Sequence, residues 1–252
     1  MVMKKENKYL DFSNKIVLVT GSTQGIGNTI ARRFASCGAK IILNGRNQDK
    51  VDAIEKEMKR NGINSVLGVS ADVGNRKEVE DMFDKIDNTF GSIDILINNA
   101  ALRPLTSFES IDDKEWNEVL HTNLTGAFIV SQVAIKRMKN KKSCSITNIS
   151  SIAARIPSKY YSGVHYISSK GGLISFTRGL AMEMGSTPIR VNAIVPGVIE
   201  TGEERKWIYK HAAESTFLKR PGNKEEVASV CLFLASDLAS YITGEIITLG
   251  GY

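Results

Sequence analysis

The 252-residue sequence predicts a single α/β domain in which a doubly wound parallel sheet of about seven strands has helices on both faces. Short runs of apolar, β-branched residues alternate with longer amphipathic stretches, a pattern typical of repeated βαβ units. These runs are apolar throughout, as expected for strands that are covered on both sides. No linker, repeat or low-complexity stretch divides residues 13–252, so we expect one domain there. The polar N-terminal segment, residues 1–12, is predicted to be flexible.

The predicted strands are Ile16–Val19, Ile41–Leu43, Val66–Val69, Ile95–Ile97, Ile146–Ile149, Val191–Val195 and Ile246–Leu249. The predicted helices include one that starts at about Ile26, together with Gln48–Lys59, Arg76–Phe90, Trp116–Lys139 and Glu225–Ala235. Ligands of a doubly wound sheet bind outside the carboxyl ends of its strands. The residues that follow each run are therefore the candidates for function.

The composition is that of an ordinary soluble protein, with 42% hydrophobic and 24% charged residues and a net charge of +6. One dense basic cluster, Lys136, Arg137, Lys139, Lys141 and Lys142, is interpreted as a solvated helix end, with a patch for an anionic partner as the alternative. We therefore expect no nucleic-acid partner.

The three cysteines, Cys37, Cys144 and Cys231, are far apart and odd in number, which favours free thiols in a reducing compartment. His121 and His211 have no other metal ligand at a suitable spacing, so no metal site is predicted. No apolar run approaches the ~18 residues of a membrane span, and Met1–Asn7 lacks the apolar core of a secretory signal. The expected location is cytoplasmic, with no membrane contact.

A glycine-rich loop follows the first predicted strand and leads into a helix. Its glycines, Gly21, Gly25 and Gly27, allow a tight turn and a close approach of the backbone to a pyrophosphate. The exposed helix N-terminus favours the same anion. The loop is therefore predicted to bind a dinucleotide through the run Gly21, Ser22, Thr23, Gln24, Gly25, Ile26 and Gly27.

Tyr166 and Lys170 are four residues apart, so on a helix both side chains leave one face, and an ammonium beside a phenol favours the phenolate. Other motifs occur in order around this pair: Thr20–Gly27, Asn98–Ala101, Asn123, Ser150-Ser151 and Pro196-Gly197. Together they resemble the short-chain dehydrogenase/reductase family, over the region from Lys15 to Gly251. The resemblance implies a Rossmann-type fold and hydride transfer between a nicotinamide cofactor and a carbonyl or secondary alcohol.

The resemblance also implies the role of each catalytic residue. Tyr166 is the expected acid–base, and Lys170 is expected to lower its pKa and to bind the nicotinamide ribose. Ser151, rather than Ser150, is expected to hydrogen-bond the substrate oxygen. Asn123 is expected to hold a water that links Lys170 to solvent.

The second predicted strand ends in Asn44-Gly45-Arg46, where NAD-preferring members of the family carry an acid. Because Gly45 occupies this position, no carboxylate repels a 2′-phosphate, and Arg46 can pair with one. Both features favour NADP(H) over NAD(H). Gln24, where many NADP-dependent members have a basic residue, departs from that pattern and leaves NAD(H) possible. The remaining implied cofactor contacts are Asp72, Val73, Asn99, Ala100, Pro196, Gly197, Ile199 and Thr201.

The substrate is the least determined part of the prediction. The loop Ile152–His165 is expected to line the substrate mouth, and residues 198–222 are expected to form a lid. The candidate substrate contacts are Ser151, Arg103, Arg155, Tyr161 and Trp207. The basic members of this set favour a sugar acid or polyol, unless they are simply exposed loop charges.

A 3-oxoacyl chain on an acyl carrier protein is the alternative substrate, since Lys139, Lys141 and Lys142 could dock an acidic carrier. Met182, where such reductases tend to have a basic residue, argues against it. In a different functional class, a non-catalytic NAD(P)-sensing regulator need not keep the full catalytic set. The expected partners are a small carbonyl or alcohol substrate and further copies of the chain, in a tetramer or dimer.

Overall fold

A computed structural model describes residues 10–138, 140–156, 163–202, 209–210, 214 and 216–251. Its main sheet has seven parallel strands in the order β3-β2-β1-β4-β5-β6-β9, which confirms the predicted fold class. The strands are β1 (Ile16–Val19), β2 (Lys40–Gly45), β3 (Val66–Ser70), β4 (Ile95–Asn98), β5 (Cys144–Ile149), β6 (Ile189–Pro196) and β9 (Ile246–Leu249).

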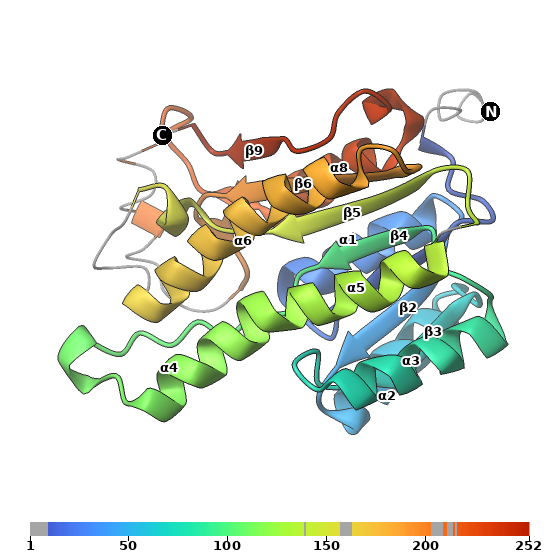
Figure 1. Ribbon diagram of the computed structural model, residues 1–252, viewed down its shortest axis with the longest axis horizontal. Helices are drawn as coiled ribbons and strands as arrows, with labels where there is room; N and C mark the ends of the chain where they lie inside the picture. Colours follow the sequence, from blue (N-terminus) through green and yellow to red (C-terminus); the bar gives the residue numbers. More distant parts are fainter. Residues whose placement is uncertain are drawn as a thin grey trace.

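The order of the strands reverses direction beside β1. The chain runs outward from β1 through β2 to β3 and then returns to place β4 against the other edge of β1 (Figure 1). Leu18 of β1 consequently lies opposite Ile42 on one side and Leu96 on the other. This reversal opens a crevice at the carboxyl ends of β1 and β4, the place where doubly wound sheets bind their ligands.

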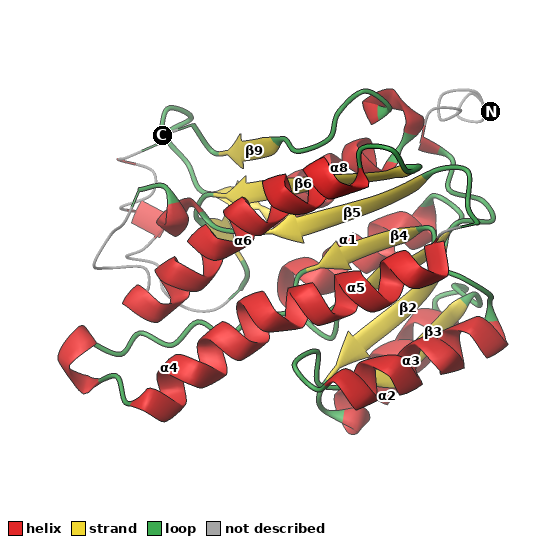
Figure 2. Cartoon of the chain, viewed as in Figure 1, coloured by secondary structure: helices red, strands yellow, loops and turns green. Residues whose placement is uncertain are grey.

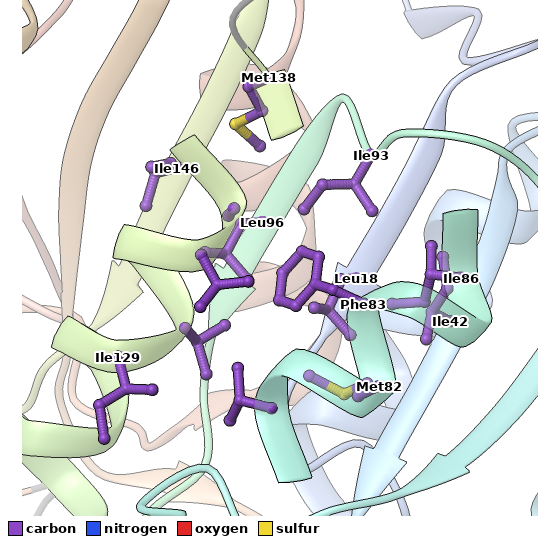
Figure 3. Packing of buried hydrophobic residues seen from close by; sticks show 14 of the residues in the cluster. Leu18, Ile42, Met82, Phe83, Ile86, Ile93, Leu96, Ile129, Met138 and Ile146 are labelled. Atoms are coloured by element: carbon purple, nitrogen blue, oxygen red, sulfur yellow. The ribbon is translucent and has the colours of Figure 1, made fainter. Parts of the chain in front are cut away.

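Helices cover both faces of the sheet. One layer consists of α3 (Arg76–Thr89), α5 (Gly126–Met138) and α6 (Val164–Met184), and Figure 2 shows α5 and α6 crossing in front of the strands. The other layer consists of α1 (Gly25–Ser36), α2 (Gln48–Arg60) and α8 (Lys224–Ala235). Figure 3 shows Phe83 of α3 between Leu18 and Leu96 of the sheet, so this helix packs its apolar face on the strands.

The stretch predicted as one helix from Trp116 to Lys139 is divided in the structure. It consists of α4 (Asp113–Leu120), a π-helical turn (His121–Thr125) and α5. Asp112 caps the start of α4 by accepting from the Glu115 backbone N–H at 2.7 Å, which explains why the helix begins before Trp116. The π turn, a feature often found at functional sites, contains Asn123.

Phe12 and the base of the predicted lid both make defined contacts with the rest of the domain. Phe12, which the sequence places in the N-terminal segment, is 2% exposed, and its ring centroid lies 4.9 Å from that of Phe34. The predicted lid is tied at its base by β7 (Ile199–Glu200), which pairs with β8 (Gly222–Asn223). Within the described residues, no helix combines the length and the apolar character needed to cross a membrane.

Candidate active site

A cavity of about 660 Å³ lies at the carboxyl ends of the central strands. Its walls come from the loop after β1 and from the segments after β4, β5 and β6, together with the first turns of α6. Twelve of the predicted site residues line it: Gln24, Gly25, Ile26, Asn99, Arg103, Ser151, Tyr166, Lys170, Pro196, Gly197, Ile199 and Thr201. The topology therefore brings sequence motifs that are far apart in the chain to one site.

The glycine loop has the backbone that close contact with a phosphate requires. Gly21 has a φ of 61°, and a Cβ on it would lie 2.8 Å from the Cα of Ala100. A Cβ on Gly27 would lie 2.5 Å from the Gly21 carbonyl oxygen. The N-terminus of α1 has no capping side chain and no acid in its first turn, so its backbone N–H groups can receive an anion. The residues present fit a dinucleotide pyrophosphate.

Hydrogen bonds hold the glycine loop against β4. Thr20 Oγ1 accepts from the backbone N–H groups of Asn99 (2.9 Å) and Ala100 (3.1 Å). The Asn99 side-chain amide donates in return to the carbonyl oxygens of Thr20 and Gly21, both at 3.0 Å. Asn99 therefore shapes the loop as well as lining the cavity.

The segment after β2 shows why no acid occupies the predicted ribose position. A Cβ on Gly45 would lie 2.8 Å from the Cγ2 methyl of Thr23, so the methyl fills the space of a side chain there. Arg46 Nη1 lies 3.7 Å from Glu118 Oε1 of α4, with both side chains about half exposed. This ion pair could not be predicted from the sequence, because the partners are distant in the chain.

Three predicted cofactor residues have packing roles in the structure. Ser22 is fully buried: its hydroxyl accepts from the Asn44 backbone N–H at 3.0 Å, and its own backbone N–H donates to the Asn44 carbonyl oxygen at 2.9 Å, so the residue fixes the loop against β2. Asp72 Oδ1 accepts from the Gly74 N–H at 2.9 Å. Val73 is 5% exposed and packs against Gly126 of α5, where a Cβ would lie 2.7 Å from its methyl.

Lys170 and Tyr166 are both buried at the base of the cavity. Lys170 Nζ donates to the Ile149 carbonyl oxygen at 2.7 Å and lies 5.8 Å from the centroid of the Tyr166 ring. Burial lowers the pKa of the Lys170 ammonium to about 8. The ammonium is therefore held beside the phenol by a backbone carbonyl and can exchange its proton near neutral pH.

The pKa of Tyr166 differs in direction from the sequence expectation. Burial raises the pKa of the phenol, while its hydrogen bond with Ser151 and the positive charge of Arg103 oppose that rise. Desolvation outweighs both effects in the protein without ligands. The charge of Arg103 therefore lowers the pKa of the Tyr166 phenol, an effect that the sequence did not indicate.

The two serines at the end of β5 have separate environments. The Ser151 hydroxyl accepts from the Ala153 N–H at 3.2 Å, at the start of the short 3-10 helix Ile152–Ala154, and Ser151 lines the cavity with Tyr166, whose pKa it lowers. The Ser150 hydroxyl is buried and donates to the Lys170 carbonyl oxygen at 2.9 Å. Ser151 consequently lies in the cavity with Tyr166, and Ser150 fixes the helix that carries Lys170.

Asn123 lies behind the cavity wall. Its Oδ1 accepts from the Leu102 N–H at 2.7 Å, and its Nδ2 donates to the Leu102 carbonyl at 2.9 Å and to Ser169 Oγ at 3.0 Å. The side chain therefore connects the segment after β4 with α6. These contacts use both N–H groups of the amide, so the second lone pair of Oδ1 is the one position on this side chain left for a water.

The predicted substrate contacts separate into three groups. Arg103 lines the cavity. Arg155 is directed elsewhere, because its guanidinium donates to Thr248 Oγ1 at 2.7 Å and to the Ile246 carbonyl at 3.3 Å on β9. Tyr161 and Trp207 lie outside the described residues.

The structure adds Tyr209, which lines the cavity and accepts from the Thr201 N–H at 3.3 Å. The sequence could have suggested Tyr209 as a site residue, because it lies within the predicted lid. In the part of the chain that the structure describes, no group of three or more His, Cys, Asp or Glu side chains is arranged to hold a metal ion.

Comparison with known proteins assigns the family. A family model described as enoyl-(acyl carrier protein) reductase matches residues 21–252. The chain is 39% identical to the 3-oxoacyl-(acyl-carrier-protein) reductase FabG of Aquifex aeolicus, with 96% of this chain and 98% of that protein covered. It is 36% identical to human dehydrogenase/reductase SDR family member 4, with coverage of 95% and 87%. The chain belongs to the short-chain dehydrogenase/reductase family and is an NAD(P)-dependent oxidoreductase.

Solved structures give the same assignment. A gluconate 5-dehydrogenase from Burkholderia cenocepacia, determined in complex with NADP and tartrate, has a TM-score of 0.89 and 26% identity, with 96% of each chain covered. A short-chain type dehydrogenase/reductase from Mycobacterium marinum has a TM-score of 0.88 and 29% identity, also with 96% of each chain covered.

Proposed function

We propose that this chain interconverts a ketone and a secondary alcohol with NADP(H), on a small substrate that carries a carboxylate, such as a sugar acid. The observation that carries the proposal is the position of Arg103 in the cavity that Ser151 and Tyr166 also line. Arg103 is exposed and has no hydrogen-bond or ion-pair partner among the described residues, so its charge is available to an anion.

The bound nicotinamide would supply the hydride in reduction or accept it in oxidation. In reduction, the Tyr166 hydroxyl gives its proton to the substrate oxygen as the carbonyl becomes an alcohol. The Ser151 hydroxyl donates a hydrogen bond to that oxygen and stabilises its developing negative charge. Lys170, with its pKa near 8, is placed to steady the phenolate and to pass a proton toward it.

NADP(H) is favoured by the surroundings of Gly45. The Thr23 methyl fills the position in which an acid would repel a 2′-phosphate, and Arg46 lies at the same strand end. The relative that holds NADP supports the same choice. Titrating each reduced cofactor by protein fluorescence should show NADPH binding at least ~10-fold more tightly than NADH, since a charged pair of this kind contributes about 1.5–3 kcal/mol. A ratio near one would contradict the proposal.

The substrate class is tested by comparing acidic with neutral carbonyl substrates, in the unmodified protein and in a variant. NADPH oxidation is followed with keto sugar acids, neutral keto esters, ketoses and acetoacetyl thioesters, first with the unmodified protein. Arg103→Gln should raise KM for the acidic substrates by ~10-fold or more relative to the neutral ones, because it removes one charge-assisted hydrogen bond. Arg178→Gln, which changes an exposed arginine on α6, is the matched control. Equal effects on acidic and neutral substrates would contradict an anion-binding role.

Reduction of a 3-oxoacyl chain on a carrier protein is the second candidate, favoured by the 39% identity to the Aquifex aeolicus reductase. The basic cluster gives it limited support. Lys141 is paired at 3.1 Å with Asp94, and Arg137 is paired with Asp84 and Asp87. Met182, 79% exposed, leaves an apolar surface on α6. Faster turnover of acetoacetyl thioesters than of any keto acid would favour this candidate.

We further propose that the protein is cytoplasmic and forms a homotetramer or homodimer. Apolar side chains exposed on two neighbouring helices support self-association: Phe128 of α5, with 42% exposure, and Val164 of α6, with 37%. Light scattering coupled to size-exclusion chromatography would give the mass of the assembly, and a monomer at micromolar concentration would contradict the proposal.

A further inference from the structure

A hydrogen bond connects α4 to the residue directly before Tyr166. His165 Nε2 lies 2.8 Å from Glu115 Oε1, and the other carboxylate oxygen, Oε2, accepts from Thr106 Oγ1 at 3.0 Å. Figure 1 shows the first turns of α6, which hold His165, beside α4. The carboxylate of Glu115 therefore joins three segments: α4, α6 and the connection that follows β4.

The imidazole is enclosed. His165 is 0% exposed, while Glu115 is 32% exposed. Because an ionised carboxylate only accepts hydrogen bonds, Nε2 must carry the hydrogen in this contact. The other ring nitrogen, Nδ1, is buried without a hydrogen-bond partner among the described residues. The pair with Glu115 is thus the one polar contact that fixes the orientation of the ring in the described structure.

The backbone at Gly163 packs closely against the His165 ring and against the segment that follows β4. A Cβ on Gly163 would lie 2.3 Å from His165 Cε1 and 3.1 Å from the Thr106 carbonyl oxygen. The Gly163 N–H also donates to the Pro104 carbonyl at 3.5 Å. The segment from Arg103 to Thr106 is consequently held against the start of α6, with Arg103 at one end and Tyr166 three residues beyond Gly163.

We propose that Glu115 and His165 are positioning residues, which hold the substrate-side wall at Arg103 in a fixed relation to Tyr166. Neither Glu115 nor His165 lines the cavity, so both would act through the residues that do. Loss of the pair frees the start of α6 and the Arg103 segment to move apart. Displacement of a reacting group by about 1 Å lowers turnover by up to ~100-fold. The inference deepens the proposed function, on which its substrate-specific part rests.

The first test needs no substrate. Hydrogen exchange measured by mass spectrometry compares the unmodified protein with Glu115→Ala and His165→Phe, which remove the contact. We expect exchange at least ~10-fold faster in peptides covering residues 102–106 and 163–167, and unchanged exchange in the glycine loop. Unchanged exchange at 102–106 and 163–167 would overturn the proposal. Asp113→Asn, an exposed carboxylate on the same helix, is the matched control.

The second test separates positioning from simple destabilisation. His165→Gln places an amide N–H close to the Nε2 position, and Glu115→Gln keeps an accepting oxygen, so both should retain kcat and KM within about threefold. His165→Phe and Glu115→Ala should lower kcat/KM by ~10-fold or more at unchanged NADPH affinity, and the double variant should be no worse than the poorer single one. The pair would have a merely structural role if His165→Gln were as impaired as His165→Phe. The same conclusion would follow if NADPH affinity were lost in parallel with activity.

A neutral keto ester and a keto sugar acid are both used as substrates. A fall in kcat with both would support positioning of Tyr166, even if the anionic substrate class were wrong. If the proposed substrate class were wrong but the positioning role correct, the unmodified protein would have low activity on keto sugar acids. The faster hydrogen exchange in Glu115→Ala and His165→Phe would still be observed.

Discussion

Replacing Lys170 by Met should remove activity and, at the same time, change the pH dependence of stability. The pKa of this lysine is lowered from 10.5 to about 8 by burial. Below about pH 8 the folded protein contains a buried ammonium, and this costs about 3 kcal/mol relative to the unfolded chain. Between about pH 8 and 10.5 the folded protein has released a proton that the unfolded chain still holds. The cost therefore falls to about 2 kcal/mol at pH 9 and about 1 kcal/mol at pH 10.

Lys170→Met eliminates this cost but also removes the hydrogen bond to the Ile149 carbonyl oxygen. The part of that loss, about 1–3 kcal/mol in all, that depends on pH is already contained in the pKa of Lys170, and the remainder is constant. The stability advantage of the variant over the unmodified protein should consequently decrease by about 2 kcal/mol between pH 7 and pH 10, whatever its value at pH 7. The pH dependence isolates the contribution of the buried charge from that of packing.

Urea denaturation at pH 7, 8, 9 and 10, followed by circular dichroism, measures the difference in free energy of unfolding. Lys114→Met, at an exposed position of α4, should show no such trend. The kcat of Lys170→Met should be lower by at least ~100-fold, the scale of a lost acid–base contribution. A stability difference that stays constant across these pH values would refute the reasoning, because Lys170 would then be equally charged in both states.

Three further substitutions have specific expected outcomes. Ser151→Ala should lower kcat by ~100-fold or more at unchanged NADPH affinity, since it removes the donor to the developing oxyanion; steady-state kinetics with a cofactor titration measure both. Glu118→Gln should tighten NADPH binding by about two- to fivefold and leave NADH unchanged, because Arg46 no longer shares its charge with an exposed carboxylate; paired fluorescence titrations compare them. Gly21→Ala should weaken both cofactors by ~10-fold or more and lower the melting temperature, since φ is 61° there and the Cβ meets Ala100.

The sheet could be predicted closely because its signal is local. Each buried strand appears as a short apolar run, and β1 and β9 have the predicted bounds. The glycine loop could be predicted equally well, since the φ values of 61° and 59° at Gly21 and Gly25 lie in the left-handed region, which glycine adopts at least cost. Residues at the carboxyl ends of these strands then follow from topology.

Side-chain direction was harder to predict because it depends on partners that are distant in sequence. Arg155 resembles any loop arginine in the sequence, yet it bonds to β9, more than 90 residues away. The π turn at His121–Thr125 leaves no mark in the apolar periodicity, so the sequence predicted one uninterrupted helix. The direction of the Tyr166 pKa was wrong for a related reason: burial is a property of the whole fold, whereas the Tyr166–Lys170 spacing is local.

The π turn also affects how Asn123 should be tested. Its amide bridges Leu102 and Ser169, and thus the segment before Arg103 and the helix that carries Tyr166 and Lys170. Removing the amide would disturb both walls of the cavity, so a fall in kcat alone would not identify a proton relay. A relay would lower kcat with a solvent isotope effect and leave KM unchanged, because only a proton transfer would be slowed. A lost bridge would raise KM as Arg103 moves, and would accelerate hydrogen exchange at residues 102–106 as loss of the Glu115–His165 pair does.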